Sequence, residues 1–203
     1  MNDRFQKAVT LIDEENARDP NTDLLDGKPV PRELLYAQRL TDWLLRLEPN
    51  ASEALQLAGR SQHIARWKIP RSSYPEGRAA YLRWRNDLKR FHANLTSDIL
   101  RRAGYDDPAI DRVRALNLKQ GFPDDPESRT LEDALCLVFL EFQFADLAAK
   151  LDRDKVLNAL RKSWNKMTER AREAALKLPF QPGERALIEE ALGTVQSARQ
   201  VNS

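Results

Sequence analysis

Hydrophobic residues recur at intervals of three and four along most of the chain, and proline and glycine residues interrupt this pattern. Such spacing puts apolar side chains on one face of a helix and is typical of amphipathic helices. Helix start and stop residues then divide the chain into about eight helices. The expected helices cover residues 2–16, 31–48, 51–67, 78–103, 107–118, 131–150, 153–177 and 183–200. Longer loops are expected at residues 19–31 and 119–128.

The composition favours an all-helical fold. Leu and Ala number 29 and 24, whereas Val and Ile together number only 13, and β-branched residues are the ones that prefer strands. A chain of 203 residues suits one compact domain. We therefore expect a single all-α domain, residues 1–203, in which the strongly apolar helix at 131–150 is the buried centre of a helix bundle.

The sequence indicates neither a membrane span nor a disulfide. No apolar run approaches the ~18 residues of a transmembrane helix, and the first residues lack the basic and apolar segments of a signal peptide. Cys136 is the single cysteine, which excludes an intrachain disulfide and is typical of a reducing compartment. We expect a soluble, cytoplasmic protein and leave its oligomeric state open.

Positive charge is concentrated in one part of the chain. The net charge is +2, but residues 60–90 carry nine basic and two acidic side chains, which is +7 for this window and −5 for the remainder. Nucleic-acid binding usually requires a broader basic surface. The charge pattern therefore favours a small anionic, phosphorylated ligand over nucleic acid as the partner.

The two histidines of the chain, His63 and His92, lie at the borders between apolar and polar helix faces. If helices 51–67 and 78–103 pack as an antiparallel pair, both imidazoles face one cleft. The residues expected to bind an anion there are Arg60, Arg66, Trp67, Arg71, Arg78, Tyr81 and Arg85. The alternatives are that the histidines are hydrogen-bonded core residues, the arginines form a solvated helix face and the aromatic residues only pack.

Two acidic residues, Glu132 and Asp133, precede the apolar run of helix 131–150. One interpretation is a capping box, in which Thr130 is the N-cap and Asp133 the residue three positions later. The other is functional: a carboxylate at the end of the central helix supplies a metal ligand or a proton acceptor. The sequence leaves both interpretations open.

Several motifs along the chain, "QHIARWKIPRSSYP", "GRAAYLRWR", "FHA", "LEDALCLVFLEFQF" and "SWNKMT", resemble those of an uncharacterised family known as domain of unknown function 4202. The resemblance covers most of the chain and implies no activity. No nucleotide-binding βα unit is indicated in the chain.

The order of His, His and a later acid is also distantly similar to that of the metal ligands in HD-domain phosphohydrolases, which are all-α metal enzymes. This resemblance implies an HD-like bundle with His63, His92 and Asp133 as metal ligands. Ala93 stands where the HD motif has its Asp, so one of the four ligands is missing, and Glu132 is the available substitute.

The resemblance implies a phosphohydrolase of one of two kinds. In the metal version, Mn²⁺, Fe²⁺, Ni²⁺ or Zn²⁺ generates hydroxide, the arginines hold the phosphates and Lys119 neutralises developing charge. In the metal-free version, one histidine is the general base and Glu132 or Asp133 orients it.

The alternative function is a non-catalytic module that binds a nucleotide, a phosphorylated metabolite or RNA on a degenerate HD scaffold. RNA binding would use stacking on the aromatic residues Trp67, Tyr74, Tyr81 and Trp84. A third possibility is a structural partner protein in which acidic residues pair with the arginines internally.

Overall fold

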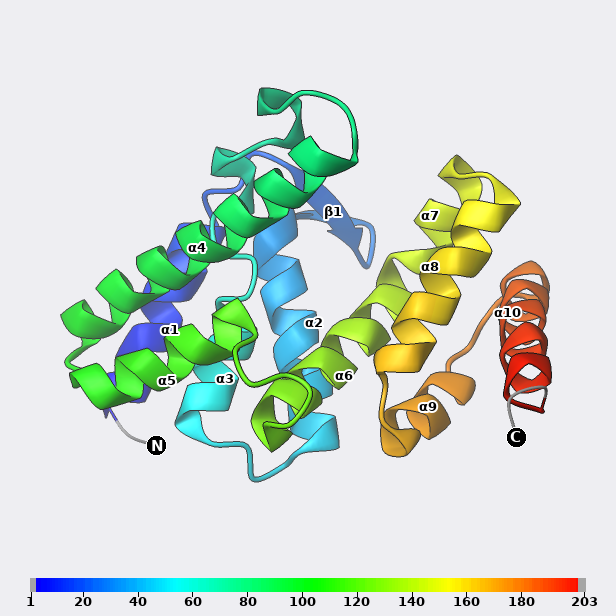
Figure 1. The fold of residues 1–203 in the computed structure, drawn as a ribbon. Coiled ribbons are helices and arrows are strands. Elements are labelled where there is room, and N and C mark those ends of the chain that lie inside the picture. Colours follow the sequence, from blue (N-terminus) through cyan, green and yellow to red (C-terminus); the bar gives the residue numbers. More distant parts are fainter. Residues whose placement is uncertain (1–2, 201–203) are drawn as a thin grey trace. The chain divides into compact units, whose positions relative to one another are not determined.

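The computed structural model describes residues 3–200, and their side chains up to residue 193. This part of the chain is mainly α-helical, as predicted, with one small hairpin (Figure 1). Its elements are α1 (Asp3–Asn16), β1 (Thr22–Leu25), β2 (Lys28–Pro31), α2 (Arg32–Leu47), α3 (Glu53–Arg60), the 3-10 helices η1 (Arg66–Lys68) and η2 (Arg71–Ser73), α4 (Arg78–Ala103), α5 (Asp107–Leu118), α6 (Pro126–Phe142), α7 (Phe144–Lys150), α8 (Arg153–Lys166), α9 (Glu169–Leu176) and α10 (Pro182–Gln200).

The chain forms two compact units, the first ending at Leu131 and the second beginning at Glu132. The boundary lies inside α6, which is one continuous helix. The two units therefore share this helix.

The first unit is a bundle in which α4 packs on α1 and α5, and α3 packs on α2 and α5 (Figure 1). Its core contains the fully buried side chains of Ile12, Leu40, Leu44, Leu55, Leu57, Ile64, Leu100, Ile110 and Leu116. Gly59 allows the close approach of α3 to α2, because a Cβ atom there would lie 3.0 Å from Cδ1 of Leu44. The apolar stripes read from the sequence therefore do form this core.

The ends of the helices in the first unit follow ordinary capping chemistry. The side chain of Ser52 accepts a hydrogen bond from the backbone N–H of Leu55 at the start of α3, and Asp106 does the same for Ala109 at the start of α5. Gly104 ends α4 in the left-handed conformation, with φ of +96°. These caps explain why the predicted bounds of the helices at 78–103 and 107–118 agree with the structure.

The expected loop at residues 19–31 is wrong in one respect, because it contains an antiparallel hairpin of β1 and β2. Its two central residues, Asp26 and Gly27, both have positive φ, as a two-residue turn between strands requires. The Asp-Gly pair is the sequence signal that predicts such a turn. The second expected loop, residues 119–128, is shorter than predicted because α6 begins at Pro126.

Three predicted helices are interrupted in the structure. The helix expected at 51–67 ends at Arg60, and the helix expected at 131–150 breaks at Gln143 into α6 and α7. The helix expected at 153–177 breaks before Thr168, whose hydroxyl accepts a hydrogen bond from the N–H of Ala171 and caps α9. Apolar periodicity continues through such breaks, and for this reason it did not predict them.

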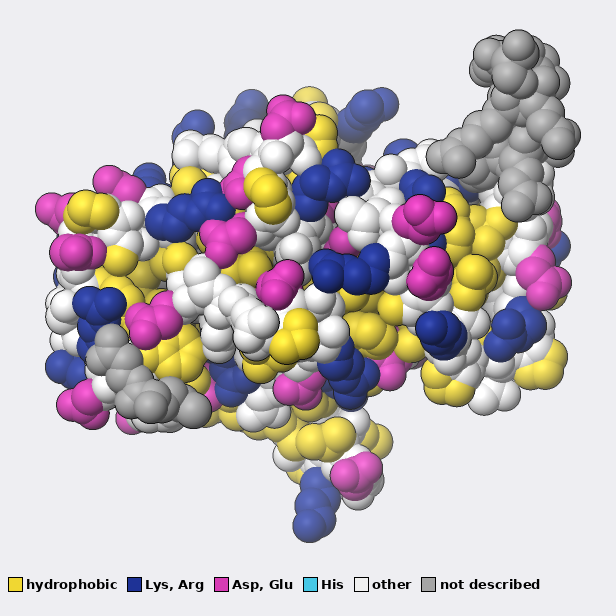
Figure 2. All heavy atoms as spheres, turned by 90° about the horizontal axis from the view of Figure 1, so that it is seen from below, with side chains coloured by type: hydrophobic (Ala, Val, Ile, Leu, Met, Phe, Trp, Pro, Cys, Tyr) yellow, Lys and Arg dark blue, Asp and Glu magenta, His cyan; other side chains and the backbone are white. Residues whose placement is uncertain are grey.

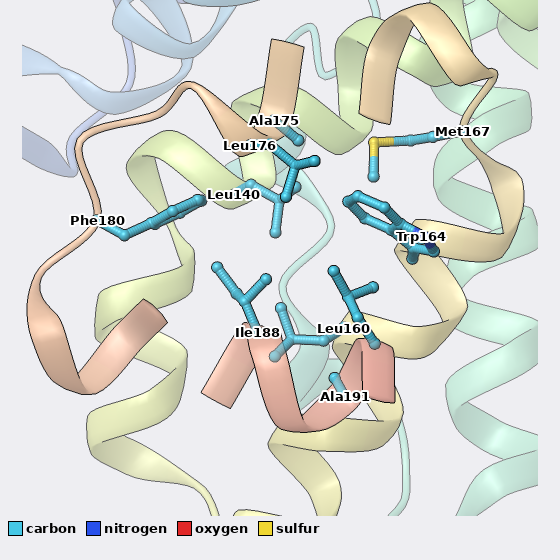
Figure 3. Close-up of a pocket in the computed structure, with 10 residues that line it drawn as sticks. Leu140, Leu160, Trp164, Met167, Ala175, Leu176, Phe180, Ile188 and Ala191 are labelled. Atoms are coloured by element: carbon cyan, nitrogen blue, oxygen red, sulfur yellow. The ribbon is translucent and has the colours of Figure 1, made fainter. Parts of the chain in front are cut away.

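The second unit has its own apolar core, formed by α8, α9, α10 and the C-terminal part of α6. Figure 3 shows side chains from these helices converging around a small gap, lined by Leu140, Leu160, Trp164, Met167, Ala175, Leu176, Phe180, Ile188, Ala191 and Leu192. The free space there is about 10 Å³, close to the minimum for one water molecule. None of the described helices has both the length and the apolar character needed to cross a membrane.

Candidate functional site

The two histidines lie together in the first unit, with ring centroids 6.1 Å apart. His92 is on α4 and is 3% exposed, whereas His63 lies in the turn of residues 61–65 after α3. The ring of His63 stacks on that of Tyr36 from α2, with centroids 4.1 Å apart and planes 10° from parallel. The structure thus brings together both imidazoles, although His63 is in a turn instead of on the predicted helix.

Buried polar side chains from neighbouring helices hold the turn that carries His63. The backbone N–H of Ala65, a residue with φ of 52°, donates a hydrogen bond to the side-chain oxygen of Asn16. The side-chain amide of Asn117 donates to Ser61 Oγ at 3.1 Å. Contacts from α1 and α5 therefore hold the turn in place. They position His63 more precisely than an exposed turn would.

Glu33, in the first turn of α2, is a candidate site residue that the sequence analysis missed. Its Oε2 lies 3.6 Å from Nδ1 of His63, and its side chain is 8% exposed. Burial raises the pKa of Glu33 from 4.5 to about 7, partly offset by the nearby positive charge of Arg66. A carboxyl group with this pKa exchanges a proton near neutral pH, as a general acid or base must. Glu33, His63 and His92 form the histidine cluster.

The folded structure favours the neutral form of both imidazoles in the histidine cluster. Burial, followed by the positive charges of Arg66, Lys119 and Arg85, holds the pKa of His63 well below 6.5. Burial and the neighbouring His63 lower the pKa of His92 to about 3. Nδ1 of His92 lies 2.7 Å from the carbonyl oxygen of Ile64, so this nitrogen carries the proton and Nε2 is a hydrogen-bond acceptor.

Four buried polar atoms around the cluster have no hydrogen-bond partner among the described residues. They are Nε2 of His92, Oε1 of Gln62, Oδ1 of Asn117 and Nδ2 of Asn16. Buried polar atoms in folded proteins are nearly always paired with protein groups, water or ligand. Three of the four are acceptors, which indicates that hydroxyl or N–H donors of bound water or of a ligand complete this region.

Three cationic side chains lie close enough to His63 to affect its pKa, namely Arg66, Arg85 and Lys119. Nε of Arg66 is 4.0 Å from Glu33 Oε1, and its guanidinium lies over the ring of Trp84 at 5.0 Å. The side chain of Arg66 is 34% exposed, so it reaches both the cluster and solvent. These three predicted residues therefore add positive charge near His63.

Two of the predicted arginines are occupied elsewhere. Arg60 forms a two-point ion pair with Asp13 of α1, at 2.7 and 2.6 Å, and its side chain is 13% exposed. Arg71 donates hydrogen bonds to the carbonyl oxygens of Tyr74 and Pro75 in its own loop. Both arginines hold the fold in this structure.

The remaining predicted ligand-binding residues lie on the surface near the start of α4. Arg78 is exposed at its first position, Tyr81 is 41% exposed, and Trp67 is half-buried in η1. The guanidinium of Arg85 lies 6.0 Å from the ring of Tyr81. No contact places these three side chains at the histidine cluster.

The carboxylates of Glu132 and Asp133 have partners within the second unit. Lys166 donates to Glu132 Oε1 at 2.9 Å, and both the backbone N–H and the hydroxyl of Thr168 donate to Asp133, at 2.8 and 2.5 Å. Asp133 thus fixes the turn between α8 and α9.

The capping-box interpretation is wrong, because α6 begins at Pro126 and the hydroxyl of Thr130 donates to the carbonyl oxygen of Pro126 inside the helix. Within the described part of the chain, no group of three or more His, Cys, Asp or Glu side chains is arranged to hold a metal ion.

Charges of both signs are mixed on the face of the molecule shown in Figure 2. Lys and Arg side chains alternate there with Asp and Glu side chains, and no described histidine is visible on it. This face does not offer the continuous basic surface that nucleic-acid binding requires.

A family model matches the chain over residues 6–188, and its description is Domain of unknown function (DUF4202). No curated protein and no solved structure matches the chain. The match identifies the family without an activity, so a function has to be argued from the geometry of the histidine cluster.

Proposed function

We propose that this chain, which belongs to the family described as Domain of unknown function (DUF4202), binds a small phosphorylated molecule at the histidine cluster. The observation that carries the proposal is the unpartnered, buried Nε2 of His92, 6.1 Å between ring centroids from a second neutral imidazole. Arg66, Arg85 and Lys119 add positive charge around it.

The two kinds of group in the cluster suit two parts of one ligand. Arginine and lysine side chains bind the oxygens of a phosphate group. The unpartnered acceptors on His92, Gln62 and Asn117 require donors, and the hydroxyl groups of a sugar supply them. A sugar phosphate or a nucleoside monophosphate satisfies both requirements.

Isothermal titration calorimetry of the full chain tests this proposal, with ribose 5-phosphate, AMP, inorganic phosphate and unphosphorylated ribose as probes. The test variants are His92→Asn, whose amide can still donate to the carbonyl of Ile64, and Arg66→Gln. Arg102→Gln is the matched control, because it is exposed near the other end of α4. We expect binding of a phosphorylated probe that weakens about tenfold or more in both test variants and not in the control. Equal binding by all variants would overturn the proposal.

Hydrolysis of the bound phosphate ester is a second candidate function, favoured by the pair of Glu33 and His63. A carboxyl with a pKa of about 7 beside a neutral imidazole can accept a proton from an attacking water and return it to the leaving group. This is the metal-free version predicted from the sequence, with Glu33 in place of Glu132 or Asp133 as the partner of the histidine. We also propose that the helix bundle is HD-like and that the protein is cytoplasmic.

The metal version requires Asp133 as a third ligand beside the two histidines, and the described residues form no such three-ligand group. We derive no step through a metal for this reason. Elemental analysis of the purified protein and of His63→Ala tests this part separately, and a bound divalent metal that is lost in the variant would restore the metal version.

Phosphate release from a panel of sugar phosphates and nucleotides separates hydrolysis from binding alone. We expect turnover to fall in Glu33→Gln while the affinity for the phosphorylated probe at pH 6 stays within about threefold of the parent. Binding that is seen in calorimetry without any phosphate release would support the binding module and refute hydrolysis.

A further inference from the structure

The first unit also has a polar concavity on its surface, where α4 packs against α5. It is an open groove with a volume of about 430 Å³, within the size range of small-molecule sites. The side chains that line it are Asn86, Lys89, Arg90, Asn94, Arg114, Leu118 and Gln120. These seven residues define the α4–α5 groove.

The lining of the α4–α5 groove is positively charged. It contains three cations, Lys89, Arg90 and Arg114, and no Asp or Glu. Nη1 of Arg114 donates to the side-chain oxygen of Asn94 at 2.6 Å, which orients the guanidinium at the edge of the groove. Arg90 is exposed to solvent. A lining with three cations and no acid attracts an anion.

The remaining lining residues narrow the class of anion. Asn86, Asn94 and Gln120 offer amide groups, which bind hydroxyl and ring nitrogen atoms. Leu118 offers one apolar surface, on which a base or a sugar ring can lie. A bare phosphate would use the cations alone, whereas a nucleotide uses all three kinds of group. Three cations match a chain of two or three phosphates better than a single phosphate.

We propose that the α4–α5 groove binds a nucleoside diphosphate or triphosphate, with its phosphates on Lys89, Arg90 and Arg114. This site has no residue in common with the histidine cluster and does not depend on the function proposed there. The two sites do share elements, since Lys89 lies one turn before His92 on α4, and Lys119 lies between Leu118 and Gln120. A ligand in the groove is therefore bound next to elements that carry the cluster.

A single-stranded RNA is the competing ligand, because it also carries phosphates and bases. The groove has a volume of about 430 Å³, which suits one nucleotide, whereas a single strand extends over several nucleotides beyond it. The geometry therefore favours the mononucleotide.

Calorimetric titration of the full chain with ADP, ATP, tripolyphosphate and a ten-nucleotide single-stranded RNA tests the proposal. The test variants are Arg90→Gln, Arg114→Gln and the double variant, and Arg102→Gln, exposed on the same helix, is the matched control. We expect ATP to bind more tightly than tripolyphosphate, and each test variant to weaken ATP binding about tenfold. His92→Asn should leave ATP binding unchanged, which separates failure of this proposal from failure of the histidine cluster.

Three results would overturn the proposal. They are the absence of ATP binding at millimolar concentration, equal affinity in the double variant and the parent, and RNA binding that is tighter than ATP binding and depends on the same two arginines. Side-chain amide signals of Asn86, Asn94 and Gln120 in NMR spectra report the place of binding directly. They should shift on addition of ATP, and shifts confined to other residues would place the ligand elsewhere and refute the groove.

Discussion

Replacing Glu33 by Gln should stabilise the first unit at alkaline pH relative to the parent protein. The carboxyl of Glu33 is buried, and its pKa is raised from 4.5 to about 7 in the folded chain. The folded state therefore binds a proton more tightly than the unfolded state, and stability is lost as pH rises from about 4.5 through 7. Gln keeps the size and the hydrogen-bonding atoms of the protonated acid and has no charge to bury.

The magnitude follows from the two pKa values. Between pH 5 and pH 8, the linkage relation gives a loss of about 2 to 3 kcal/mol from this one group. His92 acts in the opposite direction, because its pKa is lowered to about 3, and stability is then lost as pH falls from 6.5. The difference between the Glu33→Gln variant and the parent cancels the contribution of His92, so this difference is the quantity to measure.

Urea denaturation at pH 5 and pH 8 gives the free energy of unfolding without adding ions that screen charge. Amide hydrogen exchange in α2 reports the first unit separately from the second. Glu14→Gln, an exposed acid on α1, is the control and should change little between the two pH values. An equal difference between variant and parent at pH 5 and pH 8 would show that Glu33 is not a buried acid with a raised pKa.

Three further substitutions test the structural roles assigned above. Arg60→Ala should destabilise the first unit by about 1 to 3 kcal/mol, since it leaves Asp13 unpaired, and urea denaturation measures this loss. The same substitution should not change the affinity for a phosphorylated probe, which calorimetry measures. Thr168→Val should destabilise the second unit by about 1 to 2 kcal/mol, because Asp133 loses its hydroxyl donor and the N–H of Ala171 loses its capping acceptor, and faster amide exchange confined to α8 and α9 would show it. Gly104→Ala should lower stability by about 1 kcal/mol through the positive φ of +96° alone, so Gly104→Asn, which tolerates this conformation, should lose less.

The main features of the fold could be predicted from the sequence because they depend on local patterns. Apolar periodicity predicted α4 and α5 with their bounds, and Gly104 marked the end of α4 through the conformation that it alone adopts easily. The break before Thr168 depends instead on a contact with Asp133, 35 residues earlier. A local pattern carries no information about such a distant partner.

The candidate site was predictable only in part, for the same reason. The two histidines stood out because they are the only ones of the chain and lie in or next to the basic window, and the structure places their rings 6.1 Å apart. Arg60 was predicted as a ligand-binding residue, whereas its partner is Asp13, 47 residues away in the sequence. An arginine on a helix border looks the same in the sequence whether it binds a ligand or pairs with an acid of the same chain.

Glu33 shows most clearly what the sequence could not give. An acidic residue in the first turn of a helix ordinarily lies in solvent and interacts with the helix dipole. Here α2 starts directly after β2, and Asp19 accepts a hydrogen bond from the backbone N–H of Glu33. Its side chain is buried, with Oε2 3.6 Å from Nδ1 of His63. Only the tertiary arrangement gives this residue its raised pKa.

The protonation of Glu33 should also control the affinity of the histidine cluster for anions. At pH 6 most of the acid is protonated, and Arg66, Arg85 and Lys119 leave the cluster positively charged. At pH 8 the carboxylate adds a negative charge 4.0 Å from Arg66, which opposes a phosphate group by about 1 to 2 kcal/mol. Affinity for ribose 5-phosphate should therefore fall about tenfold between pH 6 and pH 8, although the phosphate itself becomes more negative over this range. In Glu33→Gln the affinity should rise or stay constant, and a parallel fall in both proteins would refute this role of Glu33.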